Sequence, residues 1–120
     1  MDKIYFSSKE TEMEIVNQNW GSLRWIVNGQ KGNSKSLTFG RVVIKKGCSN
    51  PRHAHTNCEE ILYLLKGRLR HTISTNEVLM EPGDTIVMPE GVMHNAYSIG
   101  EEDADMIVVY SSAQRDFVKE

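Results

Sequence analysis

Short apolar runs, separated by turn-forming residues, cover most of the chain. They are rich in Val, Ile, Leu and aromatic residues, the types that are enriched in β-strands. Gly67, Gly83 and Gly91 stand between such runs, where tight turns need backbone angles that glycine adopts easily. The pattern predicts nine strands, at residues 13–16, 22–28, 36–47, 59–67, 68–74, 77–81, 84–91, 94–100 and 103–111.

Almost nothing in the pattern is helical. The one candidate is a short helical turn near "SSAQRDF", at residues 111–117. Residues 4–6 form a further apolar run, which we interpret as another N-terminal strand. Many short strands with regular turns are typical of a β-barrel or a sandwich. Because no linker or tandem repeat divides the 120 residues, we predict a single all-β domain spanning 1–120.

Charge and composition disfavour several classes of function. The net charge is -2, and the absence of a basic block disfavours nucleic acid and anionic membranes as partners. No apolar run approaches the roughly 20 residues of a membrane-spanning helix, and "MDKIYFSSKETE" lacks the apolar core of a secretory signal. Cys48 and Cys58 are too few for a disulfide framework, so we expect free thiols in a cytoplasmic protein.

Imidazole and carboxylate groups concentrate in "GCSNPRHAHTNCEEILYLLKG", residues 47–67. In an extended segment, residues two apart share a face, so His53 and His55 can direct both rings to one point. Glu60 opens the next predicted strand and can reach back to add the negative charge that a divalent ion favours. The residues alone leave two interpretations open, a metal site with open coordination positions or a polar strand end.

The spacing of this stretch resembles the first motif of the cupin family. That motif is Gly, five residues, His-x-His, three or four residues, Glu, six residues and Gly. In this sequence the fixed positions are Gly47, His53, His55, Glu60 and Gly67, so motif 1 spans 47–67. The neighbouring Glu59 is the alternative carboxylate, but Glu60 gives the six residues that the motif requires before Gly67.

The second cupin motif is Gly, five residues, Pro-x-Gly, two residues, His, three residues and Asn. In this sequence the fixed positions are Gly83, Pro89, Gly91, His94 and Ser98, so motif 2 spans 83–98. Only the last position departs from the family, where Ser98 replaces Asn. The departure concerns a structural position, so it leaves the expected metal ligands in place.

The resemblance implies a small conical cupin β-barrel, also described as a double-stranded β-helix or jelly roll. It carries over four metal ligands, His53, His55, Glu60 and His94. The expected cofactor is one divalent transition metal ion, Zn, Mn, Fe, Ni or Cu, with two positions left for water, dioxygen or substrate. The alternative is a cupin fold that has lost its metal.

Three further residues are candidates for catalysis. His71 alternates with apolar neighbours, so it is either a hydrogen-bonded core histidine or an acid/base near the metal. Tyr63 could donate a phenolic proton in the pocket, or could simply pack with its hydroxyl at an edge. Arg52 abuts His53 and could hold a substrate carboxylate through two parallel hydrogen bonds; the alternative is a structural or solvated arginine.

Other side chains keep two interpretations each. Arg41 could hold a substrate carboxylate or be structural, and Cys58 could face the pocket or be a buried, inert thiol. Trp20 and Trp25, in "WGSLRW", are expected in the core or at a dimer interface, or else at the pocket mouth.

Two classes of function follow from the resemblance. We favour a metal-dependent enzyme acting on a small oxygenated substrate, such as a sugar or uronate, a keto acid or a polyketide-like molecule. Its metal would act as a Lewis acid or bind dioxygen, in isomerase, cyclase or lyase, or dioxygenase chemistry. The alternative is a non-catalytic module that binds a metal or small ligand. We expect a homodimer formed by the N-terminal strands, whose edges need partners.

Overall fold

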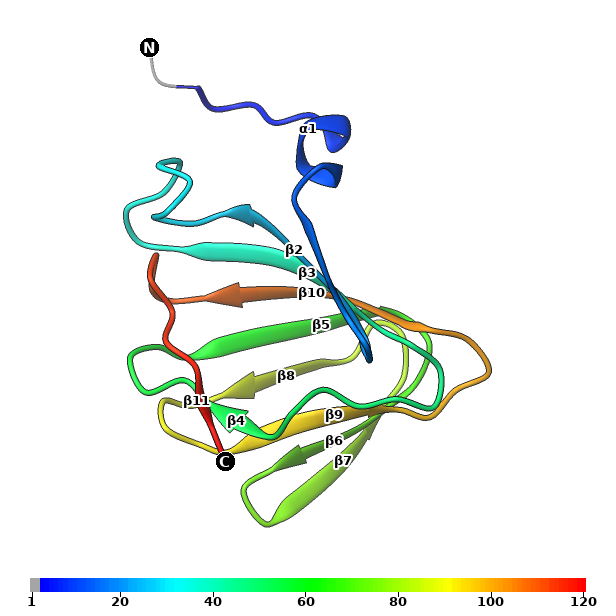
Figure 1. The fold of residues 1–120 in the computed structure, drawn as a ribbon. Coiled ribbons are helices and arrows are strands. Elements are labelled where there is room, and N and C mark those ends of the chain that lie inside the picture. The colour runs from blue at the N-terminus through cyan, green and yellow to red at the C-terminus, as the bar shows by residue number, and fades with distance from the viewer. Residues whose placement is uncertain (1–2) are drawn as a thin grey trace.

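The computed structural model describes residues 3–120 and consists almost entirely of β-strands. Two antiparallel sheets curve around a shared interior (Figure 1), with strand orders β1-β2-β3-β10-β5-β8 and β11-β4-β9-β6-β7. The elements are α1 (Ser8–Glu12), β1 (Ile15–Gln18), β2 (Gly21–Val27), β3 (Thr38–Ile44), β4 (His53–Ala54), β5 (Glu60–Lys66), β6 (Leu69–Ile73), β7 (Asn76–Met80), β8 (Thr85–Met88), β9 (His94–Ser98), β10 (Ala104–Tyr110) and β11 (Val118–Lys119).

Alternating burial along the strands builds one core between the two sheets. β3 and β10 bury every second residue, and Val42 lies opposite Met106 in their antiparallel register. Leu69 of β6 and Ala96 of β9 belong to the same buried cluster, so the five-stranded sheet packs on the same interior. Each fully buried aliphatic side chain contributes about 1.5–3 kcal/mol. The prediction of an all-β, jelly-roll architecture is confirmed.

All nine predicted strands overlap observed ones, but the chain ends differ from expectation. Residues 4–6 do not form a strand. Residues 111–117, where a short helical turn was expected, contain a turn that is not helical. The short strands β4 and β11 were not predicted. β11 pairs with β4, Val118 with Ala54 and Lys119 with His53, and β4 also pairs with β9; a local pattern cannot show such partners.

The helix α1 was also not predicted. Its N-cap is Ser7, whose hydroxyl accepts a hydrogen bond from the Glu10 main-chain N–H at 3.3 Å. The sequence from Ser7 to Glu10 is the S-x-x-E pattern of a helix start. The helix has no apolar stripe that would have drawn attention to it. Within residues 3–120 no helix has the length and apolar composition needed to cross a membrane.

The ends of the two motifs are tied together through the main chain. The Gly47 N–H donates to the Ser98 carbonyl at 3.0 Å, and the Ser98 N–H donates to the Cys48 carbonyl at 2.9 Å. Both bonds use main-chain atoms and do not depend on the side chain at position 98. Ser98 therefore forms them although the family motif has Asn at this position. Gly67, between β5 and β6, has a φ of 84°, and a Cβ there would lie 2.8 Å from the Cα of Ala104, so this turn requires glycine.

Candidate metal centre

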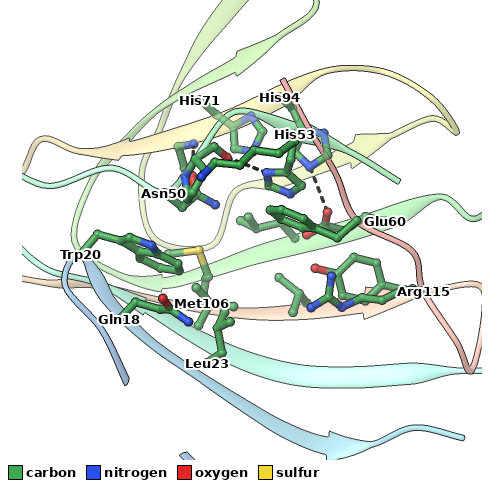
Figure 2. A pocket seen from close by; sticks show the side chains of 18 of the residues that line it. Gln18, Trp20, Leu23, Asn50, His53, Glu60, His71, His94, Met106 and Arg115 are labelled. Carbon is green, nitrogen blue, oxygen red and sulfur yellow. Dashed lines mark hydrogen bonds and ion pairs between the residues drawn. The ribbon is translucent and has the colours of Figure 1, made fainter. Parts of the chain in front are cut away.

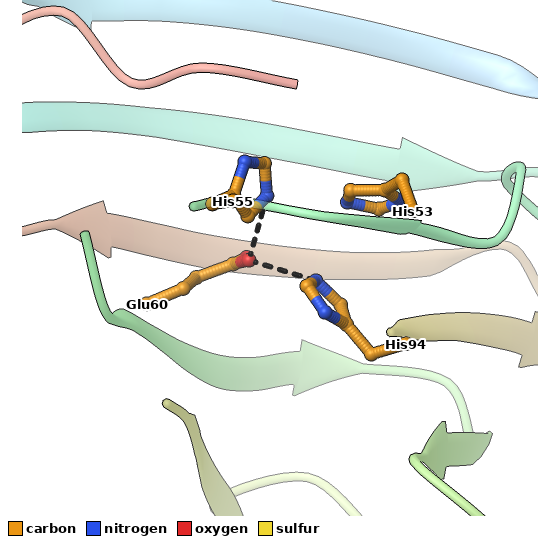
Figure 3. Close-up of side chains that lie close together, drawn as sticks. All are labelled: His53, His55, Glu60 and His94. Atoms are coloured by element: carbon orange, nitrogen blue, oxygen red, sulfur yellow. Dashed lines mark hydrogen bonds and ion pairs between the residues drawn. The ribbon is translucent and has the colours of Figure 1, made fainter. Parts of the chain in front are cut away.

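Four buried side chains converge in the interior, from three strands and one loop. His53 lies in β4, Glu60 opens β5 and His94 opens β9, while His55 follows β4 directly. One ligand atom from each lies within 4.8 Å of the others, and Figure 3 shows His55 and His94 directed at the Glu60 carboxylate. The structure therefore brings together the four ligands that the motifs imply.

Main-chain carbonyl groups fix the tautomer of each imidazole. A carbonyl oxygen can only accept a hydrogen bond, so the ring nitrogen beside it must carry the proton. In a neutral ring the other nitrogen, Nε2, then has an unprotonated lone pair available for a metal. The three Nδ1 atoms donate as follows: His53 to Pro51 at 2.6 Å, His55 to Asp116 at 2.5 Å and His94 to Val92 at 2.9 Å.

These tautomers leave electron-rich atoms facing one another. The Glu60 Oε1 atom lies 3.3 Å from His55 Nε2 and 3.2 Å from His94 Nε2. Lone pairs at such distances repel unless a cation lies between them. Ligand atoms at right angles around an ion, with bonds of about 2.1 Å, are about 3 Å apart. Three imidazoles and one carboxylate so arranged form a site that fits one divalent transition metal ion.

The protonation states also suit metal binding at neutral pH. Burial lowers the pKa of His53 to about 4, so this ring is neutral at pH 7. A metal therefore does not have to displace a proton from this ring.

The C-terminal segment supports two of the ligands. The Phe117 ring stacks on His53, with 4.6 Å between ring centroids and 20° between their planes. Asp116 accepts the His55 Nδ1 proton through its carbonyl oxygen. Its carboxylate is hydrogen-bonded by the main-chain N–H and the hydroxyl of Thr56. Such outer contacts orient metal-binding imidazoles, so this segment is part of the site.

A cavity of about 370 Å³ opens beside the ligands, and His53, Glu60 and His94 reach it. Its charged lining within residues 3–120 consists of Glu60 and two cations, Arg115 and Lys119. This lining is net positive, and a bound divalent ion would add to its positive charge, which favours an anionic ligand. Figure 2 shows its side chains, and its apolar wall is formed mainly by Trp20, Leu23, Trp25, Val42, Met106 and Val108.

Of the three predicted catalytic residues, only His71 reaches the cavity. Its ring stacks on His94 at 5.9 Å, its Nδ1 atom has no hydrogen-bond partner, and burial lowers its pKa to about 4. Tyr63 is 42% exposed on the outer face of β5. Arg52 donates to Glu120 and to two other oxygens away from the cavity. The expectation that Tyr63 and Arg52 act at the site is therefore corrected.

The other residues of the sequence analysis also have definite places. Arg41 forms two hydrogen bonds with Asp105, at 2.8 and 2.7 Å, and does not line the cavity. Cys58 is a buried free thiol whose pKa is raised by burial. Trp20 and Trp25 both pack against the core cluster and also line the cavity, so two of the expectations for this pair are confirmed.

Two residues that sequence reasoning missed complete the cavity. The Arg115 guanidinium carbon lies 4.2 Å from the centre of the Trp25 ring and 5.2 Å from that of Tyr110. The Tyr110 ring lies 4.9 Å from that of His55, and burial raises the pKa of its phenol well above the usual value. Tyr110 follows the alternation of buried residues along β10, so the sequence pattern could have identified it as facing inward. Arg115 lies outside both motifs, and no pattern in the sequence marks it.

Comparison with known proteins places these observations in a family. The cupin domain family matches residues 40–110. Oxalate oxidase 1 of Hordeum vulgare is 32% identical over 122 residues, which cover 92% of this chain and 61% of that protein. Germin-like protein 3-8 of Oryza sativa subsp. japonica is 34% identical over 86 residues, which cover 67% of this chain and 38% of that protein. The chain thus spans less than two thirds of these relatives.

Solved structures agree on the fold. An oxalate oxidase structure superposes with a TM-score of 0.80 at 25% identity, covering 95% of this chain and 62% of that one. Oxalate decarboxylase from Bacillus subtilis at pH 4.6 gives a TM-score of 0.84 at 20% identity, covering 92% of this chain and 30% of that one. Together with the match over residues 40–110, these similarities show that the chain belongs to the cupin domain family.

Proposed function

We propose that this protein is a divalent-metal-dependent enzyme that acts on a small carboxylate. The observation that carries the proposal is Arg115, a cation at the cavity that has no acidic partner within ion-pair distance in residues 3–120. A guanidinium binds a carboxylate through two parallel hydrogen bonds. Lys119 adds a second positive charge to the lining.

The relatives indicate which metal and substrate to test first. Several are named oxalate oxidases, and one matched structure concerns the Mn(II) centres of Bacillus subtilis oxalate decarboxylase. Manganese and oxalate are therefore the first metal and the first ligand to examine. An oxidase would convert oxalate and dioxygen into carbon dioxide and hydrogen peroxide, whereas a decarboxylase would release carbon dioxide and formate, so the products distinguish the two reactions.

The side chains around the cavity suit such chemistry. The bound metal would supply a Lewis acid that polarises a substrate oxygen. Arg115 would orient the carboxylate, and the phenol of Tyr110, which stays protonated, could donate a hydrogen bond to it. The apolar wall excludes water, which strengthens the electrostatic interactions inside the cavity. Ligand binding without turnover would instead favour the non-catalytic module.

Removing the Arg115 charge should weaken carboxylate binding. A hydrogen bond to a charged group contributes about 1.5–3 kcal/mol, so Arg115→Gln is expected to raise the Kd of oxalate about 10- to 150-fold. Titration calorimetry on metal-loaded protein would measure this. The control is Arg68→Gln, which removes an exposed arginine paired with Glu81 outside the cavity. Equal oxalate affinity in both variants would contradict the role given to Arg115.

We also propose that the protein forms a homodimer. β1 lies at the edge of the six-stranded sheet, and all four of its residues are exposed. An open, exposed edge can pair with the same strand of a second copy. Light scattering at micromolar concentration should then give twice the 13.7 kDa of the chain, and a monomer at that concentration would exclude the proposal.

A further inference from the structure

The cavity has two chemically different ends. Figure 2 shows Trp20, Leu23 and Met106 on one side and Glu60 with Arg115 on the other. Oxalate has about six heavy atoms, and even at the roughly 30 Å³ that a water molecule occupies it would fill about half of the 370 Å³. The apolar end would then hold only water, which apolar walls bind poorly.

The apolar end also offers few partners for hydroxyl groups. Gln18 and Asn50 are the amide side chains of the lining, and Gln18 is exposed. The Asn50 Oδ1 atom already accepts the Ala96 N–H at 2.8 Å. A sugar or uronate would bury several hydroxyls there with too few partners, and each unpaired polar group costs affinity. This argues against the polyhydroxylated substrates considered from the sequence.

We propose that the cavity selects 2-oxo or 2-hydroxy acids that carry an apolar side chain, in preference to oxalate. The inference rests on the proposed function, since it takes the carboxylate to lie at Arg115 beside the metal centre. The oxygen at carbon 2 gives such an acid a second donor for the metal. The side chain extends toward Trp20, Leu23 and Met106, where it displaces water from apolar surface.

The proposal predicts a dependence on side-chain length. Each buried methylene should tighten binding about fourfold. Titration calorimetry on manganese-loaded protein would compare glyoxylate, pyruvate, 2-oxobutanoate, 4-methyl-2-oxopentanoate and phenylpyruvate with oxalate. We expect a rising series in which 4-methyl-2-oxopentanoate binds at least about tenfold more tightly than oxalate. The wild-type series tests the proposal without any variant.

A substitution in the wall tests where the side chain lies. Leu23→Gln keeps the approximate volume but replaces apolar surface by an amide, so it should weaken 4-methyl-2-oxopentanoate about tenfold and glyoxylate less than about twofold. The control is Leu37→Gln, at a leucine that is 49% exposed and does not line the cavity. A general loss of stability would weaken all the ligands together and so would not change the slope of the series.

The outcomes separate this inference from the proposed function. A flat series, or oxalate as the tightest ligand, overturns the inference, while the carboxylate binding itself would still support the proposed function. If the neutral amides of the same acids bound as tightly as the acids, the anchoring of a carboxylate would be wrong, and both proposals would fall. Both would also fall if none of the acids bound to metal-loaded protein.

Discussion

Glu60→Gln is expected to lose its metal on dialysis, whereas Glu59→Gln should retain it. Glu60 is 4% exposed and is the only anionic member of the four-ligand cluster. Its amide replacement keeps the shape but removes the charge that a divalent ion favours. Loss of an outer partner of a metal ligand already costs about 10- to 100-fold in affinity, so we expect more than about 100-fold here. Metal analysis after dialysis measures the difference.

The same variant tests the tautomers of the imidazoles. Without metal, the wild-type carboxylate oxygen faces two unprotonated Nε2 atoms, of His55 and His94, if the Nδ1 protons are donated to the main-chain carbonyls. The amide that Glu60→Gln introduces can donate a hydrogen bond to one of them. Metal-free Glu60→Gln should therefore melt no lower than metal-free wild type.

The dialysis experiment also tests the motif register. If Glu60→Gln retained its metal and Glu59→Gln lost it, the motif register would be wrong.

The metal ligands could be predicted because the spacing of both motifs resembles that of the cupin family, and the resemblance carries over His53, His55, Glu60 and His94. The two-residue period of a β-strand also determines which way Tyr63 faces. Once Glu60 faces inward, Tyr63 lies on the opposite face of β5, as the burial pattern shows. The outward position of Tyr63 therefore follows from the position of Glu60 in the sequence.

The contribution of the C-terminal segment could not be predicted in this way. Arg115 and Phe117 lie beyond both motifs, in a segment without apolar periodicity. They reach the cavity because residues 111–120 run back to β4, where β11 pairs with it (Figure 1). A two-residue pairing has no local sequence signature. The candidates for a carboxylate anchor were consequently Arg41 and Arg52, which the structure pairs with Asp105 and Glu120.

Metal should stabilise the folded protein, because its ligands come from segments that only folding brings together. At a metal concentration of about 100 times Kd, the gain in the free energy of unfolding is about 2.7 kcal/mol. For a domain of this size, that corresponds to a melting temperature about 10 °C higher. Thermal unfolding of metal-loaded and metal-free protein at pH 7.5 would show the difference. Its absence, in protein proven to bind metal, would contradict a site shared between the motifs.

Acidification should destabilise the metal-free protein in a defined range of pH. Burial lowers the pKa of His53 and of His71 from 6.5 to about 4. Between these values the unfolded chain binds protons that the folded chain does not, so stability falls as pH drops from about 6.5 to 4. Each such histidine contributes about 1.4 kcal/mol per pH unit. At pH 5 the His53 ring is still neutral, so protonation of this ligand should not yet release the metal.

His71→Phe isolates one of these two contributions, because His71 is buried at the cavity but is not a metal ligand. The metal-free variant should lose stability less steeply on acidification than metal-free wild type, by about one proton, or about 1.4 kcal/mol per pH unit. Urea unfolding at several pH values from 6.5 to 4.5 measures both slopes, and metal content at pH 7.5 serves as the control. Parallel slopes would show that His71 titrates alike in the folded and unfolded chains, and that its burial against His94 does not hold the ring neutral.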